Sequence, residues 1–125
     1  MFIAAGGACG ALLRYGLEGL VHRFLAPDFP WGTFAVNLVG CLLIGLIWSL
    51  AEQNLIAPSG QAFLIVGLIG SFTTFSTYTL QSLNLVRDGE LMLGLANLAG
   101  SVVFGIGAAV LGLMIAQHVL RWVGS

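Results

Sequence analysis

The chain has 125 residues, of which 58% are hydrophobic and only 7% are charged, and its formal net charge is −1. Soluble domains normally carry about 25% charged residues, so the composition excludes an ordinary soluble domain and indicates a membrane protein. The small net charge gives no reason to expect a nucleic-acid partner. About 20 apolar residues cross a bilayer as a helix, so four crossings use most of the chain. We expect one all-α transmembrane domain over residues 1–125, embedded in the lipid bilayer.

Apolar segments predict four transmembrane helices, at residues 2–20, 33–50, 63–86 and 91–119. Breaks between them are predicted where proline, glycine and charged residues gather, at residues 27–30, 58–60 and 87–90. Four antiparallel crossings put both termini and the second connection on one side of the membrane. The first and third connections then face the other side.

Small residues in the first helix favour close packing. Gly6 and Gly10 stand four residues apart, a spacing that lets helix backbones approach closely in lipid. Cys9 and Cys41 both lie in apolar stretches. Two cysteines in separate buried helices are more often small packing residues than a disulfide or a metal site.

The basic residues give only a weak signal for orientation. Arg23 and Arg87 fall on one side of the predicted membrane and Arg121 on the other, Arg14 lies within or near the end of the first helix, and there is no lysine. The excess of basic residues in cytoplasmic loops normally sets the orientation of a membrane protein. We therefore expect the chain to insert both ways, and a dimer of two opposed copies follows naturally, because four helices alone enclose little pore.

The third segment carries the most informative stretch, GLIGSFTTFSTYT at residues 67–79. It places glycines, hydroxyls and aromatic rings at membrane depth, where a helix is loosened only if protein or an aqueous path covers the freed backbone groups. Such an interruption is typical of a binding or conduction site. Phe75 and Tyr78 stand three apart and project to similar sides, although aromatic pairs of this kind are also common in cores.

Polar residues on three helices could form a track through the membrane. Thr33 and Asn37 share one face of the second helix, and Asn97 and Ser101 share a face of the fourth. In the third helix Thr74, Thr77 and Gln81 follow a helical spacing. A mid-membrane asparagine either holds helices together or takes part in function, and the two roles are compatible.

The donor groups on this track suit a small anion. Amides and hydroxyls donate hydrogen bonds, and aromatic rings have a positive edge. No carboxylate lies mid-span, which argues against a proton-coupled exporter of cations. His22 and His118 lie near span ends without partners that would suggest catalysis, so we do not expect an enzyme.

Four motifs together resemble the fluoride channel family called Fluc or CrcB. They are GALLRY at residues 10–15, GTFAVNLVG at 32–40, GLIGSFTTFSTY at 67–78 and NLAGS at 97–101, in the same order and over essentially the whole chain. The resemblance implies an antiparallel, dual-topology homodimer with two fluoride pores. It also implies passive export of fluoride across the plasma or inner membrane of a microbe, which protects the cytoplasm.

The resemblance also implies roles for individual residues. Phe75 and Tyr78 correspond to two pore-lining phenylalanines, and Asn37 corresponds to the pore asparagine. Thr33 and Ser101 fall on the polar track, and we add Thr77 to this candidate anion pathway. The family's structural sodium ion at the dimer centre binds backbone carbonyls that fall here at Gly70 and Thr73. Arg14 matches the family's first-helix arginine, which we interpret as a structural or vestibule charge.

This chain departs from the family pattern at two positions. Tyr78 adds a hydroxyl that could donate a hydrogen bond, and it raises the alternative that the partner is a related rather than an identical subunit. Gln81 stands where the family can carry glutamate.

Two other functions remain open on the residues alone. A small multidrug exporter is also a four-helix dimer of similar length, but it needs a buried glutamate in the first helix, which Arg14 and Glu18 fit poorly. A scaffolding subunit would explain the glycines but not the polar track.

Overall fold

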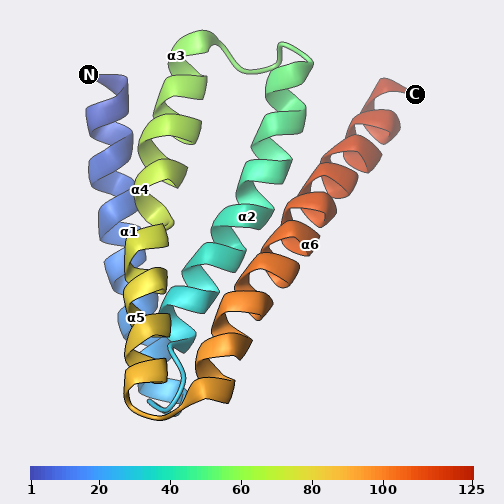
Figure 1. Ribbon diagram of the computed structural model, residues 1–125. Helices are drawn as coiled ribbons and strands as arrows, with labels where there is room; N and C mark the ends of the chain where they lie inside the picture. The colour runs from blue at the N-terminus through green and yellow to red at the C-terminus, as the bar shows by residue number, and fades with distance from the viewer.

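The structure is a computed structural model that describes residues 1–125, and it is entirely helical (Figure 1). The elements are α1 (Phe2–Phe24), α2 (Trp31–Glu52), α3 (Pro58–Gln61), the π-helix η1 (Ala62–Ile69), α4 (Gly70–Phe72), α5 (Phe75–Arg87) and α6 (Leu91–Gly124). Elements α3 to α5 follow one another as a single bent rod. Both termini lie at the same end of the bundle as the connection between α2 and α3, as the predicted crossings require (Figure 1).

Three segments are long and apolar enough to cross a membrane: Trp31–Glu52, Pro58–Arg87 and Leu91–Gly124. The predicted first crossing, α1, is not among them, and it carries Arg14, Glu18 and Arg23. Its 23 residues measure roughly 35 Å at 1.5 Å per residue, which matches a hydrocarbon core of about 30 Å. Because α1 packs along η1 and α4, it lies beside an apolar segment that does qualify.

The helix ends differ from the sequence prediction in an instructive way. The expected break at residues 58–60 is wrong, because Pro58 begins α3 and the connection consists of residues 53–57. Proline is well tolerated at the first helical position, where its missing N–H would have no partner in any case. Helix α1 continues past residue 20 to Phe24, and the basic side chains of His22 and Arg23 in its last turn are favourable at a helix C-terminus.

The predicted interruption of the third helix is confirmed at Thr73 and Thr74. Both residues are extended, with φ/ψ of −84°/156° and −146°/116°, between α4 and α5. The stretch before them is unusual as well, because η1 is a π-helix of eight residues. π-Helices are rare, occur mostly as single turns inside α-helices, and are frequently found at functional sites.

Helices α1 and η1 touch backbone to backbone. A Cβ atom added at Gly6 would overlap the carbonyl of Phe63, and one added at Gly10 would overlap the carbonyl of Leu68. Next to this contact, the hydroxyl of Ser71 donates to the carbonyl of Gly7 over 2.8 Å. The glycines of α1 therefore set how close the bent third helix comes, as expected for small residues in membrane helices.

We predict that Gly10→Ala destabilises the protein by about 1–3 kcal/mol, the usual cost of forcing extra atoms into a packed interface. Thermal or denaturant unfolding in detergent measures the loss. Gly7→Ala in the same helix is the control, because a Cβ there meets nothing within 4 Å. Equal stability of the Gly10 and Gly7 variants would contradict the close approach of α1 and η1.

Candidate functional site

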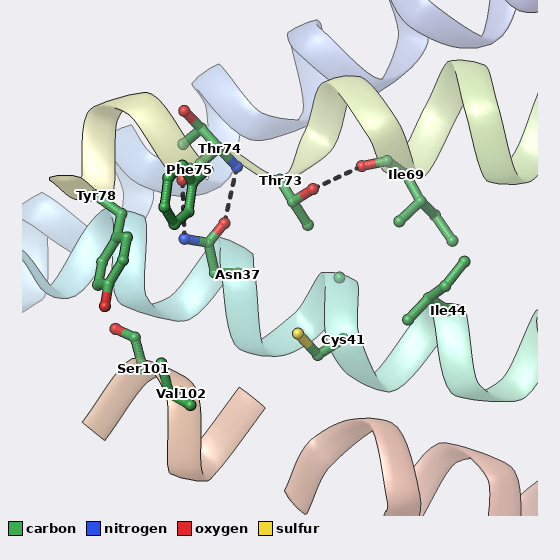
Figure 2. Close-up of a pocket in the computed structure, with 11 residues that line it drawn as sticks. Asn37, Cys41, Ile44, Ile69, Thr73, Thr74, Phe75, Tyr78, Ser101 and Val102 are labelled. Atoms are coloured by element: carbon green, nitrogen blue, oxygen red, sulfur yellow. Dashed lines mark hydrogen bonds between the residues drawn. The ribbon is translucent and has the colours of Figure 1, made fainter. Parts of the chain in front are cut away.

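A hollow of about 380 Å³ lies beside the break, between α2, the broken third helix and α6 (Figure 2). Apolar side chains and small polar groups share its wall, and no Asp, Glu, Lys or Arg is present. The lining residues are Asn37, Gly40, Cys41, Ile44, Ile69, Thr73, Thr74, Phe75, Tyr78, Ser101 and Val102. Four of the six predicted anion-pathway residues therefore meet at one place, although they come from three helices.

Asn37 joins α2 to the break through both backbone groups of Thr74. The Thr74 N–H donates to Asn37 Oδ1 over 2.8 Å, and Asn37 Nδ2 donates to the Thr74 carbonyl over 3.1 Å (Figure 2). A side-chain amide has one acceptor oxygen and two N–H donors. The pair therefore satisfies the exposed backbone of Thr74 and leaves the second N–H of Asn37 uncommitted.

The Thr74 side chain starts the lower half of the helix. Its Oγ1 accepts from the Thr77 N–H over 3.3 Å and donates to Thr77 Oγ1 over 3.0 Å, so Thr74 is the N-cap of α5. Threonine is a favoured N-cap because its oxygen satisfies one of the N–H groups left without partners at a helix start. The Thr77 hydroxyl, predicted to lie on the anion pathway, is part of this cap and does not line the hollow.

The same hydrogen bonds release two backbone carbonyls. In a continuous helix the Thr74 N–H would donate to the Gly70 carbonyl, and the Thr77 N–H would donate to the Thr73 carbonyl. Here those two N–H groups donate to Asn37 and to Thr74 Oγ1 instead. The oxygens of Gly70 and Thr73, the two positions predicted to bind sodium, are thus among those that the break deprives of their usual partners.

Phe75 and Tyr78 lie side by side in the first turn of α5, with ring centroids 5.7 Å apart and planes at 50°. Phe75 is 78% exposed, whereas Tyr78 is 7% exposed. The Tyr78 hydroxyl donates to the Leu98 carbonyl of α6 over 2.9 Å. The hydroxyl that distinguishes this chain from the family pattern is therefore already engaged by protein.

A buried chain of hydrogen bonds connects α5 and α6. Asn97 Nδ2 donates to Ser82 Oγ, and Ser82 Oγ donates to the Tyr78 carbonyl, both over 2.8 Å. Ser101 Oγ donates to Asn97 Oδ1 over a longer 3.4 Å. Sequence reasoning found the Asn97–Ser101 pair by its four-residue spacing but missed Ser82, which has no distinctive spacing.

The remaining predicted residues lie outside the hollow. Thr33 is only 3% exposed, one helical turn before Asn37 on α2. Arg14 belongs to α1, and its Nε donates to the Ser71 carbonyl over 3.1 Å. This contact gives Arg14 a structural partner at the end of α4, two residues before the break.

The arrangement has the groups needed to hold a small anion weakly. It offers an amide N–H, a serine hydroxyl and aromatic ring edges in an apolar wall, and the N-terminus of α5 adds a partial positive charge. No nucleophile stands beside a base.

Residues 1–113 match the family described as CrcB-like protein, Camphor Resistance (CrcB). The chain belongs to this family. Three CrcB relatives carry the name fluoride-specific ion channel FluC. The protein of Salinibacter ruber is 52% identical over 106 residues, which is 85% of this chain and 80% of the relative. The protein of Maridesulfovibrio salexigens is 40% identical over 121 residues, which is 96% of this chain and 96% of the relative. The protein of Solidesulfovibrio magneticus is 44% identical over 117 residues, which is 93% of this chain and 94% of the relative.

We predict that Asn37→Ala lowers the free energy of unfolding by about 2–4 kcal/mol, because it leaves the N–H and the carbonyl of Thr74 without partners. Denaturant unfolding in detergent measures this loss. Asn84→Ala on the exposed face of α5 is the matched control and should be near neutral. If the two variants unfold alike, Asn37 does not hold the break.

Proposed function

We propose that this chain is a fluoride-selective, passive channel that exports fluoride across the cytoplasmic membrane and lowers its concentration in the cell. The observation that carries the proposal is the meeting of Asn37, Phe75, Tyr78 and Ser101 in one hollow at the helix break. Three relatives that cover most of this chain carry the name of a fluoride-specific channel. A channel also explains polar groups in three membrane helices, which a scaffold would not need.

Fluoride is small and strongly hydrated, so removing its water is the main barrier to conduction. The second N–H of Asn37 and the hydroxyl of Ser101, whose bond to Asn97 is long at 3.4 Å, can replace part of that water. The exposed ring of Phe75 can add its positive edge. Because the walls carry no fixed charge, binding stays weak enough to allow the ion to leave.

The working unit in this proposal is a dimer of two opposed copies. In a single chain the hollow is open, and Phe75 and Gly70 are exposed beside it. A second copy would cover that face and close the pathway. The arginines at the two ends, Arg23 and Arg87 on one side against Arg121 on the other, leave orientation weakly specified, which favours copies inserted both ways.

A structural sodium ion at the centre of that dimer fits the donor set. The carbonyls of Gly70 and Thr73 lack their usual helical partners, and oxygen dipoles can replace the hydration of a cation. Two copies on a twofold axis would supply four such oxygens without any acidic residue. The ion would hold the two breaks together and would not move with fluoride.

Reconstitution of the purified chain alone should give fluoride efflux from liposomes, with little chloride efflux under the same gradient. Phe75→Ile should lower the fluoride efflux by about tenfold, the factor that roughly 1.4 kcal/mol of lost ring-edge interaction produces. A fluoride electrode measures the fluoride efflux of the parent and of the variant, and a chloride electrode measures the chloride control.

Phe24→Ile is the matched control for this substitution. Phe24 is 79% exposed, nearly the same as Phe75, but it lies at the end of α1 away from the hollow. Absence of efflux from well-folded parent protein would refute the channel. Equal efflux from the two variants would remove Phe75 from the pathway.

Replacing sodium by N-methylglucamine should lower the melting temperature of the purified dimer, because the facing carbonyls lose their shared ion. A melting temperature that does not change when sodium is replaced would exclude the ion.

The orientation of the chain can be tested with Ser125→Cys in a background where Cys9 and Cys41 are serine. An impermeant thiol reagent should then label half of the protein from each side of the membrane. Labelling from one side of the membrane only would exclude the opposed dimer.

A further inference from the structure

Two adjoining hollows lie at the C-terminal end of α6, far from the helix break, and they share Gln117 and Arg121. The first, about 340 Å³, lies between the ends of α2 and α6 and is lined by Gln53, Gln117, Leu120 and Arg121. The second, about 550 Å³, continues along α6 toward its middle, where Leu111, Met114 and Ile115 line it. One hollow is polar and its neighbour is largely apolar.

The length of α6 puts this pair at the membrane surface. Its 34 residues measure roughly 51 Å at 1.5 Å per residue, well beyond a hydrocarbon core of about 30 Å. Residues 91–116 contain no charged side chain, and Arg121 and Trp122 follow them. Trp48 stands near the corresponding end of α2. Indole rings at both helix ends are typical of the headgroup region.

The polar hollow is positively charged and has no acidic group in its wall. Arg121 is exposed in the last turn of α6, and its guanidinium has five N–H donors. Glu52, the carboxylate at the end of α2, accepts from Trp48 Nε1 over 2.9 Å. The amides of Gln53 and Gln117 add further N–H donors to the same space.

We propose that this end of α6 binds an anionic phospholipid, with the headgroup phosphate on Arg121, Gln117 and Gln53 and an acyl chain along Leu111, Met114 and Ile115. Arginine favours phosphate because its planar fork can donate two parallel hydrogen bonds. The shared residues Gln117 and Arg121 join a charged head site to an apolar tail site, which a free phosphate ion would not need. The proposal does not depend on fluoride conduction.

Native mass spectrometry of the detergent-purified chain tests it directly. With equal amounts of phosphatidylglycerol and phosphatidylcholine of the same acyl chains, the parent should retain about fivefold more of the anionic lipid, the factor expected from one cation near the surface. Arg121→Gln should remove this preference. Gln117→Leu, which keeps the arginine, should weaken it.

Arg87→Gln is the matched control, because it removes one arginine from a helix end at the opposite side of the bundle. It should retain the parent's preference. Unchanged lipid retention by folded Arg121→Gln, an equal loss in Arg87→Gln, or complete displacement of the lipid by inorganic phosphate would each overturn the proposal. Fluoride efflux in liposomes of neutral lipid is measured separately, so a failed channel and a failed lipid site give different results.

Discussion

The pairing of Asn37 with Thr74 is the interaction on which the rest of the structure depends. A helix that opens inside a membrane exposes backbone groups, and each unsatisfied group costs several kcal/mol there. One amide side chain from α2 satisfies both the N–H and the carbonyl of Thr74. Because this solution uses a single residue, α2 must stand at a fixed height beside the break. That height brings Asn37 into the hollow with Phe75 and Tyr78.

The opposite side of the break is held by α1, by a different physical means. Gly6 and Gly10 allow backbone contact with η1, and the hydroxyl of Ser71 donates to the Gly7 carbonyl. Arg14 then donates to the Ser71 carbonyl, one of those left at the end of α4. A guanidinium at membrane depth is costly, but half-buried Arg14 donates to a backbone oxygen that needs a donor. The charge that lowers the hydropathy of α1 is thus also a support for the bent third helix.

The family could be predicted from the four motifs, and the helical class from the apolar segments. The broken third helix could be predicted because glycine, threonine and aromatic residues gathered at membrane depth indicate an interrupted helix. Other features needed the structure. Pro58 was misread because proline both ends helices and begins them, and only the neighbouring packing decides which. The π-helical turns of η1 leave no mark in residue type. Thr33 and Thr77 share helix faces with pathway residues, but spacing along a helix does not say which hydroxyls cap a backbone and which face a hollow.

The hydrogen bonds around the break also occupy several hydroxyl donors of a segment that is rich in them. The hydroxyl of Thr73 donates to the Ile69 carbonyl, that of Thr74 donates within the cap, and that of Tyr78 donates to Leu98. These donors are consumed by the backbone of the broken helix and of α6. In the proposed channel, an anion in the hollow would therefore meet the spare N–H of Asn37, the loosely held hydroxyl of Ser101 and ring edges, rather than a complete shell of strong donors. A complete shell would hold a small halide too tightly to release it, so the groups that stabilise the fold would also limit how strongly the proposed pathway binds.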